Sequence, residues 1–321
     1  MVFFLFRVNF LVLCYNHSMN FIIDEDTEKQ RIDIFLADYI PDFSRSKLQA
    51  LIKDGHVLVN SKTVRPSYVL KSADVIEVNL QSVANLLALA PENIPLEVVW
   101  EDDNMAVINK PSGMLTHPTP QELSGTLVNA LLYKYGELLS DINGDLRRGI
   151  VHRLDRNTSG LLMIAKNNKT HEYLVQQMKD KAFCKKYIAI VKGVVEKDVF
   201  EINAPIGRHL TQPHKQCVRE DGKESLTLVN VLDRFEDATL LELTLITGRT
   251  HQIRVHLSSI GHPVYNDTLY GFGKIKIKTE EQVLQSYKLE FTKPFSDERV
   301  CLEIGKDAKF LKVLGALKKS V

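Results

Sequence analysis

A single carboxylate set among basic residues, directly before an apolar run, is the feature that most constrains this chain. Residues 149–160 read GIVHRLDRNTSG, and the run LLMIA follows at residues 161–165. The run predicts a buried strand, which the Thr-Ser-Gly turn introduces. The basic neighbours Arg153 and Arg156 favour the ionised form of Asp155. Asp155 is therefore either a positioned catalytic carboxylate or one half of a structural ion pair at a strand end.

A second basic segment follows an alternating strand predicted at residues 239–245. It reads GRTHQIRVH at residues 248–256. If residues 250–256 are extended, Arg254 shares a polar face with Gln252, and the isoleucine and valine beside it pack inward. The sequence thus predicts that Arg254 faces a polar site.

A third segment reads KKYIAIVKG at residues 185–193 and predicts another strand. Tyr187 lies on the face that it shares with Ala189 and Val191. Strands favour aromatic residues for packing, so Tyr187 taken alone is either a core residue or part of a site.

Together, the three segments resemble the RluA/RluD family of RNA pseudouridine synthases. The resemblance runs in order over residues 91–305 and includes the further blocks NKPSGML at 109–115, GTLVNAL at 125–131, GHPV at 261–264 and LYG at 269–271. It implies that Asp155 is the catalytic aspartate. It also implies that Tyr187 packs against the target base and that Arg254 pairs with the aspartate.

The implied reaction breaks the bond between ribose and a uracil nitrogen, turns the base and rejoins it through a ring carbon. No atom enters or leaves overall, so we expect no cofactor. Asp155 could add covalently to the sugar or base, or abstract a ribose proton to give a glycal, and the sequence leaves both routes open. A uridine in folded RNA must also leave its stack. Arg153 is our candidate for filling the gap, and Arg249 is a further candidate RNA contact.

The histidines and cysteines do not predict a metal site. His251 and His256 lie five positions apart, and the four cysteines are widely scattered. We therefore expect no metal. Four cysteines without close pairs in 321 residues indicate a reducing, cytoplasmic setting rather than a disulfide framework.

The charge balance limits how the chain can bind its expected partner, structured RNA. The chain has 41 Lys plus Arg against 40 Asp plus Glu, a net charge of +1. RNA affinity must therefore come from local basic patches and not from the field of the whole molecule.

One such patch is predicted near the N-terminus. Apolar residues at helical spacing predict a helix over 31–39, and a second helix over 45–53 would be capped by Ser44. Short strands follow at 57–59 and 75–78. This order resembles the small alpha-L RNA-binding domain first seen in a ribosomal protein. The candidate RNA contacts are Arg31, Ser44, Arg45 and Lys47.

The chain divides into four parts by these patterns. Residues 1–18 form an apolar extension that we expect to lie outside the fold, with Met19 as the working start and no membrane anchor. Residues 19–80 form the alpha-L-type α/β domain, and residues 81–95 a linker. Residues 96–314 form the catalytic domain, predicted as α+β with a mainly antiparallel sheet and flanking helices. Its strands are predicted at 105–109, 161–165, 187–191, 226–231 and 239–245, and its helices at 126–139 and 169–181.

Two classes of function follow from these features. The first is a monomeric enzyme that isomerises uridines in large-subunit ribosomal RNA, with transfer RNA as the nearest alternative target. The second is a non-catalytic RNA-binding or ribosome-assembly factor that keeps the fold. The presence of Asp155, Tyr187 and Arg254 together favours the enzyme.

Overall fold

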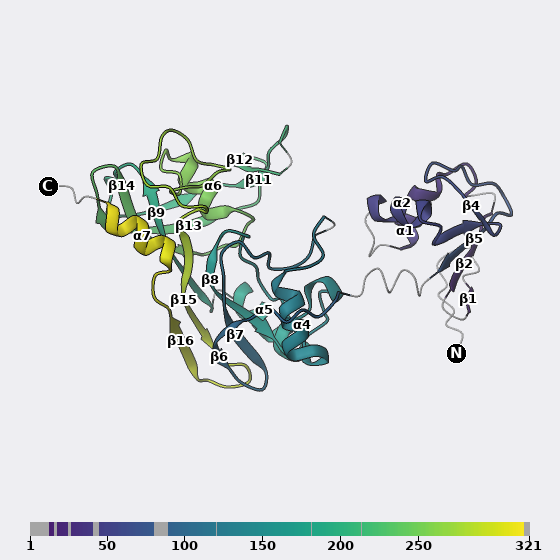
Figure 1. The fold of residues 1–321 in the computed structure, drawn as a ribbon, viewed down its shortest axis with the longest axis horizontal. Coiled ribbons are helices and arrows are strands. Elements are labelled where there is room, and N and C mark those ends of the chain that lie inside the picture. The colour runs from purple at the N-terminus through teal and green to yellow at the C-terminus, as the bar shows by residue number, and fades with distance from the viewer. Residues whose placement is uncertain are drawn as a thin grey trace. The chain divides into compact units, whose positions relative to one another are not determined.

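The chain forms two compact units, residues 1–89 and residues 90–321, which are described separately below (Figure 1). The computed structural model describes residues 13–15, 18–24, 27–40, 45–79, 89–119, 121–180, 182–212 and 214–317. In these ranges no helix has the length and apolar character needed to cross a membrane.

The N-terminal unit is a sheet with two helices. Its antiparallel strands follow the order β1-β2-β5-β3-β4. The elements are β1 (Leu13–Tyr15), β2 (Ser18–Ile22), α1 (Ile32–Tyr39), α2 (Arg45–Lys53), β3 (Val57–Val59), β4 (Lys62–Thr63) and β5 (Val75–Asn79). The two predicted helices and the strands at 57–59 and 75–78 are confirmed.

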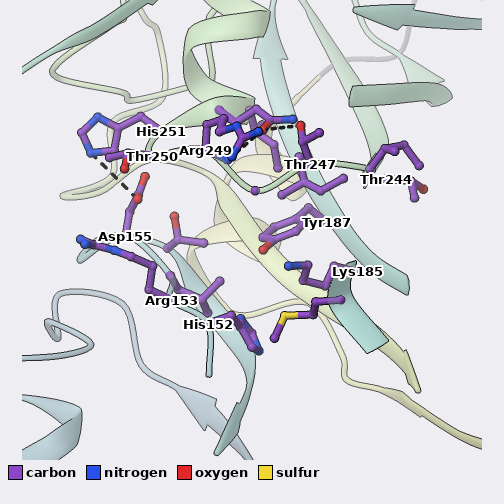
Figure 2. A pocket seen from close by; sticks show the side chains of 18 of the residues that line it. His152, Arg153, Asp155, Lys185, Tyr187, Thr244, Thr247, Arg249, Thr250 and His251 are labelled. Carbon is purple, nitrogen blue, oxygen red and sulfur yellow. Dashed lines mark hydrogen bonds and ion pairs between the residues drawn. The ribbon is translucent and has the colours of Figure 1, made fainter. Parts of the chain in front are cut away.

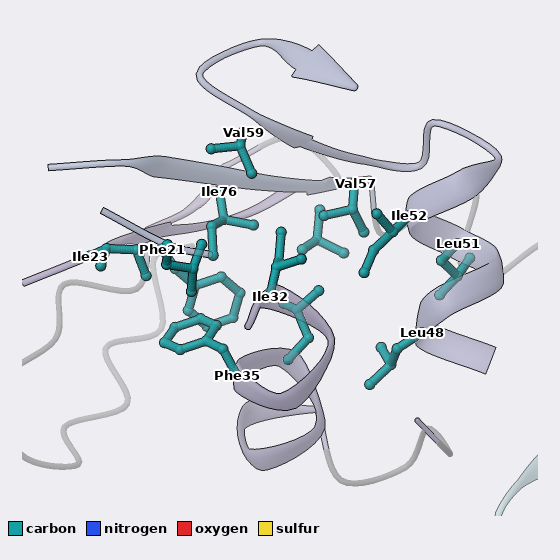
Figure 3. Packing of buried hydrophobic residues seen from close by; sticks show 13 residues of the cluster. Phe21, Ile23, Ile32, Phe35, Leu48, Leu51, Ile52, Val57, Val59 and Ile76 are labelled. Atoms are coloured by element: carbon teal, nitrogen blue, oxygen red, sulfur yellow. The ribbon is translucent and has the colours of Figure 1, made fainter. Parts of the chain in front are cut away.

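The apolar faces of both helices meet the sheet in one core (Figure 3). Ile32 and Phe35 project from α1, and Leu48 and Ile52 from α2, each at the helical spacing that predicted these elements. The ring of Phe21 on β2 meets Phe35 edge to face, with ring centroids 5.6 Å apart. Each helix and the sheet thus bury one apolar face in a shared core, and this burial stabilises the N-terminal unit.

The described part of the expected N-terminal extension includes a strand. β1 pairs with β2 from Leu13↔Asn20 to Tyr15↔Ser18. β2 is paired with β5 on its other side, so an apolar segment just upstream can add a strand to the open edge. Four described residues of the range that we expected to lie outside the fold, Leu13–Tyr15 and Ser18, are therefore part of this sheet.

The C-terminal unit is built on one large sheet, in the order β10-β13-β14-β9-β15-β8-β7-β6, with β16 also paired to β15. Its pairings are antiparallel except where β15 meets β8, which confirms the predicted α+β fold with a mainly antiparallel sheet. The strands are β6 (Glu97–Glu101), β7 (Met105–Lys110), β8 (Ser159–Ala165), β9 (Cys184–Lys192), β10 (Val199–Asn203), β13 (Leu226–Arg234), β14 (Ala238–Leu245), β15 (Leu284–Thr292) and β16 (Arg299–Glu303).

Helices cover different parts of this sheet (Figure 1). They are α4 (Leu127–Tyr135), α5 (Asn168–Lys179), α6 (Gln252–Ser259) and α7 (Ala308–Ala316), and a separate hairpin joins β11 (Ile206–Arg208) to β12 (Gln216–Val218). Leu174 of α5 packs in the core of β7 and β8. Phe310 and Val313 of α7 pack on β9 and β14. The helices predicted at 126–139 and 169–181 correspond to α4 and α5.

The extended segment predicted at 250–256 is wrong, because residues 252–259 form α6. The prediction took these residues as extended, with Ile253 and Val255 on the inner face of a strand. In the structure His251 adopts the left-handed region, with φ 57° and ψ 20°, and starts the helix without a side-chain cap. Arg254 therefore lies on a helix and not on the face of a strand, although it does reach a polar site.

The last residues of the expected linker are bound to the C-terminal unit. The Glu92 carboxylate accepts a hydrogen bond from the Gly125 backbone N–H at 3.0 Å, and the Asn129 amide donates to the Ala90 carbonyl at 3.0 Å. Residues 81–88 of the expected linker lie outside the described residues.

Candidate active site

A cleft of about 470 Å³ opens where three segments of the C-terminal unit converge. They are the loop from Val151 to Thr158, the start of β9, and the segment from Thr244 to Arg254 that leads into α6. These are the three segments that the sequence singled out. Figure 2 shows Asp155 and His251 on one side of the cleft and Tyr187 and Lys185 on the other.

The loop that carries Asp155 is fixed on both sides of that residue. The Thr116 hydroxyl donates to the Leu154 carbonyl at 2.8 Å. Lys110, which is fully buried, donates to the carbonyl of Arg156 at 3.1 Å and to the carbonyls of Pro111 and Met114 in its own segment, each at 2.8 Å. Burial, with the nearby charge of Lys309, lowers the pKa of Lys110 to about 7. Neither anchor touches the Asp155 carboxylate, so the backbone is held while the side chain faces the cleft.

One arginine links Asp155 to a second, buried carboxylate. Arg254 donates through Nε to Asp267 at 2.7 Å and through a terminal nitrogen to the other Asp267 oxygen at 2.9 Å. Its remaining terminal nitrogen donates to Asp155 at 3.0 Å. Such a two-point pair fixes the guanidinium plane, so Asp267 determines how Arg254 meets Asp155.

The ionised forms of this buried pair stabilise each other. Burial alone would lower the pKa of Arg254, but the hydrogen bonds and charge of Asp267, together with the charge of Asp155, raise it above its usual range. Burial would likewise raise the pKa of Asp267, and the hydrogen bonds from Arg254 outweigh that effect and lower it. Arg254 and Asp267 therefore stay charged over the working pH range.

Gln252 holds the start of α6 in place. Its side-chain oxygen accepts hydrogen bonds from the Arg249 backbone N–H and the Thr247 hydroxyl, each at 2.9 Å. Its amide nitrogen donates to the Leu226 carbonyl and the Thr227 hydroxyl on β13, each at 3.0 Å. The tight loop before α6 is thus tied to the sheet, which explains why this polar residue is buried.

Tyr187 lies on β9 with 5% of its surface exposed. Burial, and then the negative charge of Asp155, raise the pKa of its hydroxyl above the usual range, so the phenol stays neutral. The structure thus brings Asp155, Tyr187 and Arg254 to one cleft.

The model of the family described as RNA pseudouridylate synthase matches residues 104–259, and the S4 domain model matches residues 30–76. An uncharacterized RNA pseudouridine synthase of Aquifex aeolicus is 43% identical over 302 residues, covering 91% of this chain and 95% of that protein. This chain belongs to the RNA pseudouridine synthase family. The resemblance seen in the sequence is confirmed.

Two further comparisons agree with this pseudouridine synthase assignment. Ribosomal large subunit pseudouridine synthase D of Xanthomonas campestris pv. campestris is 36% identical over 292 residues, covering 87% of this chain and 86% of that protein. The solved structure of human RNA pseudouridylate synthase domain containing 1 aligns with a TM-score of 0.55 at 24% identity, covering 72% of this chain and 98% of that one. The latter supports the fold.

Two predicted RNA contacts of this pseudouridine synthase line the cleft. Arg153 is exposed and lies two residues before Asp155. Arg249 is exposed, but its Nε donates to the Glu224 carbonyl at 3.0 Å, which holds it against the loop. Arg153 is thus better placed than Arg249 to reach an incoming RNA.

The predicted contacts in the S4 domain share one buried carboxylate. Arg31 and Arg45 both pair with Asp33, at 3.0 and 2.9 Å, and their own side chains are 42% and 49% exposed. Burial would raise the pKa of Asp33, but hydrogen bonds from these arginines and from Gln49 lower it to about 2. Arg45 therefore braces α2 against α1, Arg31 pairs within the start of α1, and both arginines keep an exposed edge. Ser44, and the side chain of Lys47, lie outside the described residues.

Four residues at the site went unassigned in the sequence. Asp267 and Tyr270 fall near the LYG block, yet neither had been given a role. The Tyr270 hydroxyl lies 2.8 Å from His251 Nδ1, and the Tyr270 ring lies under the Arg254 guanidinium at 5.0 Å. His251 Nε2 is 3.9 Å from Asp155, and burial lowers the pKa of His251. Lys185 also lines the cleft.

Proposed function

We propose that this chain converts specific uridines of large-subunit ribosomal RNA to pseudouridine, with Asp155 as the catalytic residue. The observation that carries the proposal is the Asp155 carboxylate, 17% exposed in the cleft and held 3.0 Å from Arg254, opposite Tyr187. The relative named ribosomal large subunit pseudouridine synthase D supports the ribosomal target, and the S4 match supports binding of structured RNA.

Each residue has a distinct part in this proposal. Asp155 acts at the ribose, either by bonding to it or by removing a proton from it. Arg254 keeps the Asp155 carboxylate in position through a charge-assisted hydrogen bond. Tyr187 offers its ring to the uracil and limits where the freed base can move. Arg153 fills the gap that the flipped uridine leaves in the RNA.

The cellular compartment in which the enzyme works is part of the same proposal. Among the described residues Cys184, Cys217 and Cys301 are free thiols, which suits a reducing compartment and supports work in the cytoplasm.

The proposal is tested with Asp155→Asn, which keeps the size of the side chain and removes its charge. We expect product formation on large-subunit ribosomal RNA to be abolished, while the Kd for RNA changes less than about threefold. Asp145→Asn, at an exposed carboxylate paired with Arg148, is the matched control and should keep the wild-type rate. Turnover of Asp155→Asn within about tenfold of wild type would contradict the assignment.

The target is tested by mapping pseudouridine in cells with and without the gene. We expect one or more positions of large-subunit ribosomal RNA to lose the modification. Loss from transfer RNA alone would redirect the proposal to that substrate. Full retention of every pseudouridine in both RNAs would instead favour a non-catalytic factor.

A further inference from the structure

Lys185 places a cation in the cleft that the proposed chemistry leaves unused. It lies two residues before Tyr187 on β9, and the alternation of a strand directs both side chains to the same face. Figure 2 shows the Lys185 nitrogen beside the Tyr187 ring, on the side of the cleft opposite Asp155.

The surroundings of Lys185 are mainly apolar. Its Nζ lies 5.3 Å from the centroid of the Phe183 ring, and Met178 and Val151, which also line the cleft, pack in the same hydrophobic cluster as Phe183. In the part of the chain that the structure describes, Lys185 has no carboxylate partner. The neighbouring Lys186 differs, because its Nζ pairs with Glu242 at 3.0 Å. A cation held without a counter-charge in a cleft is suited to a ligand that brings negative charge.

The reaction creates such a charge. When the bond between ribose C1′ and uracil N1 breaks, the bonding electron pair stays with the uracil, whose charge spreads over N1, O2 and O4. C1′ is then bonded to an Asp155 oxygen, or joined to C2′ by a double bond after a C2′ proton has moved to Asp155. An electron pair of the ring next forms the bond from C5 to C1′. On the first route the bond from C1′ to the Asp155 oxygen breaks at the same time, and on the second the Asp155 proton returns to C2′. The C5 proton then leaves and N1 takes up a proton, so no atom is gained or lost overall. The base is anionic between these two bonds on either route.

We propose that Lys185 is a catalytic residue whose ammonium group binds the carbonyl oxygens of the target uracil and stabilises its negative charge when the base leaves the ribose. This inference rests on the proposed function, since it takes the ribose to lie at Asp155. A base attached there extends across the cleft toward Tyr187 and Lys185. The ammonium can then donate to O2 or O4, and the low polarity around it strengthens that interaction.

The pH dependence of the single-turnover rate distinguishes a Lys185 that acts as a cation from a Lys185 that acts as a general base. Burial lowers the pKa of Lys185 to about 8. A lysine needed as a cation supports the reaction below that pKa, and the rate falls as pH rises through it. A lysine acting as a general base would give the opposite slope. The other titratable or charged groups lining the cleft are His152, Arg153, Asp155, Cys184, Tyr187, Arg249, His251 and Arg254.

The test measures single-turnover rates at saturating RNA. Lys185→Met should lower the rate about 100-fold and leave the Kd for RNA within about threefold of wild type. Lys186→Met, which removes the adjacent charge from the other face of β9, is the matched control and should stay close to the wild-type rate. A rate for Lys185→Met equal to that of the control would overturn the proposal.

A second variant, Lys185→Arg, tests the role of Lys185 even if Lys185→Met folds poorly. Lys185→Arg retains a charge at all working pH values, so its rate should stay level between about pH 7 and about pH 9, where the wild-type rate falls. The RNA titrates identically in both reactions, so the difference isolates Lys185. A wild-type rate that rises through this range, or profiles of the same shape, would overturn the proposal. Asp155→Asn is measured in parallel. If the proposed function is wrong, Asp155→Asn stays active; if only the role of Lys185 is wrong, Asp155→Asn is inactive.

Discussion

At the scale of single residues, Arg254 serves two carboxylates that differ in what else they contact. Asp267 is fully buried and accepts two hydrogen bonds from Arg254 and two from the backbone N–H groups of Leu269 and Tyr270. Asp155 accepts one hydrogen bond from Arg254 and faces the cleft. One guanidinium thus contacts two carboxylates, and of the two only Asp155 lines the cleft that substrate can reach.

Asp267→Asn tests whether the buried carboxylate positions Arg254. We expect the single-turnover rate to fall at least about tenfold and unfolding to become easier by about 3 kcal/mol, because a buried guanidinium loses half of its fixed pairing. The Kd for RNA should stay the same. Asp221→Asn, at an exposed aspartate that also pairs with an arginine, is the control. If both variants keep the wild-type rate, Asp267 has no positioning role.

The residues of the site differ in how well the sequence alone predicts their structure and contacts. The apolar run after Asp155 and the alternation around Tyr187 carry local periodic signals, so their strands were predictable. Asp267 meets Arg254 because the chain folds back after α6, and no local pattern encodes such a contact. The family resemblance brought Asp155, Tyr187 and Arg254 together in the prediction and paired Arg254 with the aspartate, but the second carboxylate, Asp267, required the fold.

At the scale of elements, α6 shows why a short buried helix resembles a strand. Residues 252–257 are all buried, so no polar face marks the helical period. α5 differs, because Asn167 caps it by accepting a hydrogen bond from the Thr170 N–H at 2.8 Å, and only one of its faces is buried. A helix with one exposed face is predictable from the periodic pattern of its sequence. A helix that is buried on every face lacks that pattern.

Gly160 tests the junction between β8 and β15, the one parallel pairing in the described sheet. Its φ is +114°, and a Cβ there would lie 2.0 Å from the Ser286 carbonyl oxygen. Gly160→Ala should therefore cost on the order of 3 kcal/mol or more in unfolding free energy, since backbone would have to move.

Gly125→Ala measures the cost of backbone strain without a steric clash. Gly125 also has a positive φ, +69°, but its added Cβ would meet nothing within 4 Å. This variant should cost about 1 kcal/mol, because only the backbone conformation is disfavoured. Equal losses for the two variants in denaturant unfolding would show that the close approach to Ser286 has no special cost.

At the scale of the whole molecule, each unit has its own hydrophobic core. The core cluster of the N-terminal unit lies within residues 21–78, and the two core clusters of the C-terminal unit lie within residues 105–313. Every proposed catalytic side chain belongs to the second unit. With a net charge of only +1, the chain needs local contacts for RNA affinity, and we propose the exposed edges of Arg31 and Arg45 as two of them.

Deletion of residues 1–89 should therefore separate docking from chemistry. We expect the Kd for structured RNA to rise about tenfold or more and its salt dependence to weaken, because fewer phosphates are neutralised and fewer counterions released. The single-turnover rate at saturating RNA should fall less than about threefold. The measurement needs rates over RNA concentration at two salt levels, with a cooperative thermal transition showing that the shortened protein is folded. A collapse of the rate at saturation, with affinity and salt dependence unchanged, would mean that the N-terminal unit helps to build the active site instead of docking the RNA.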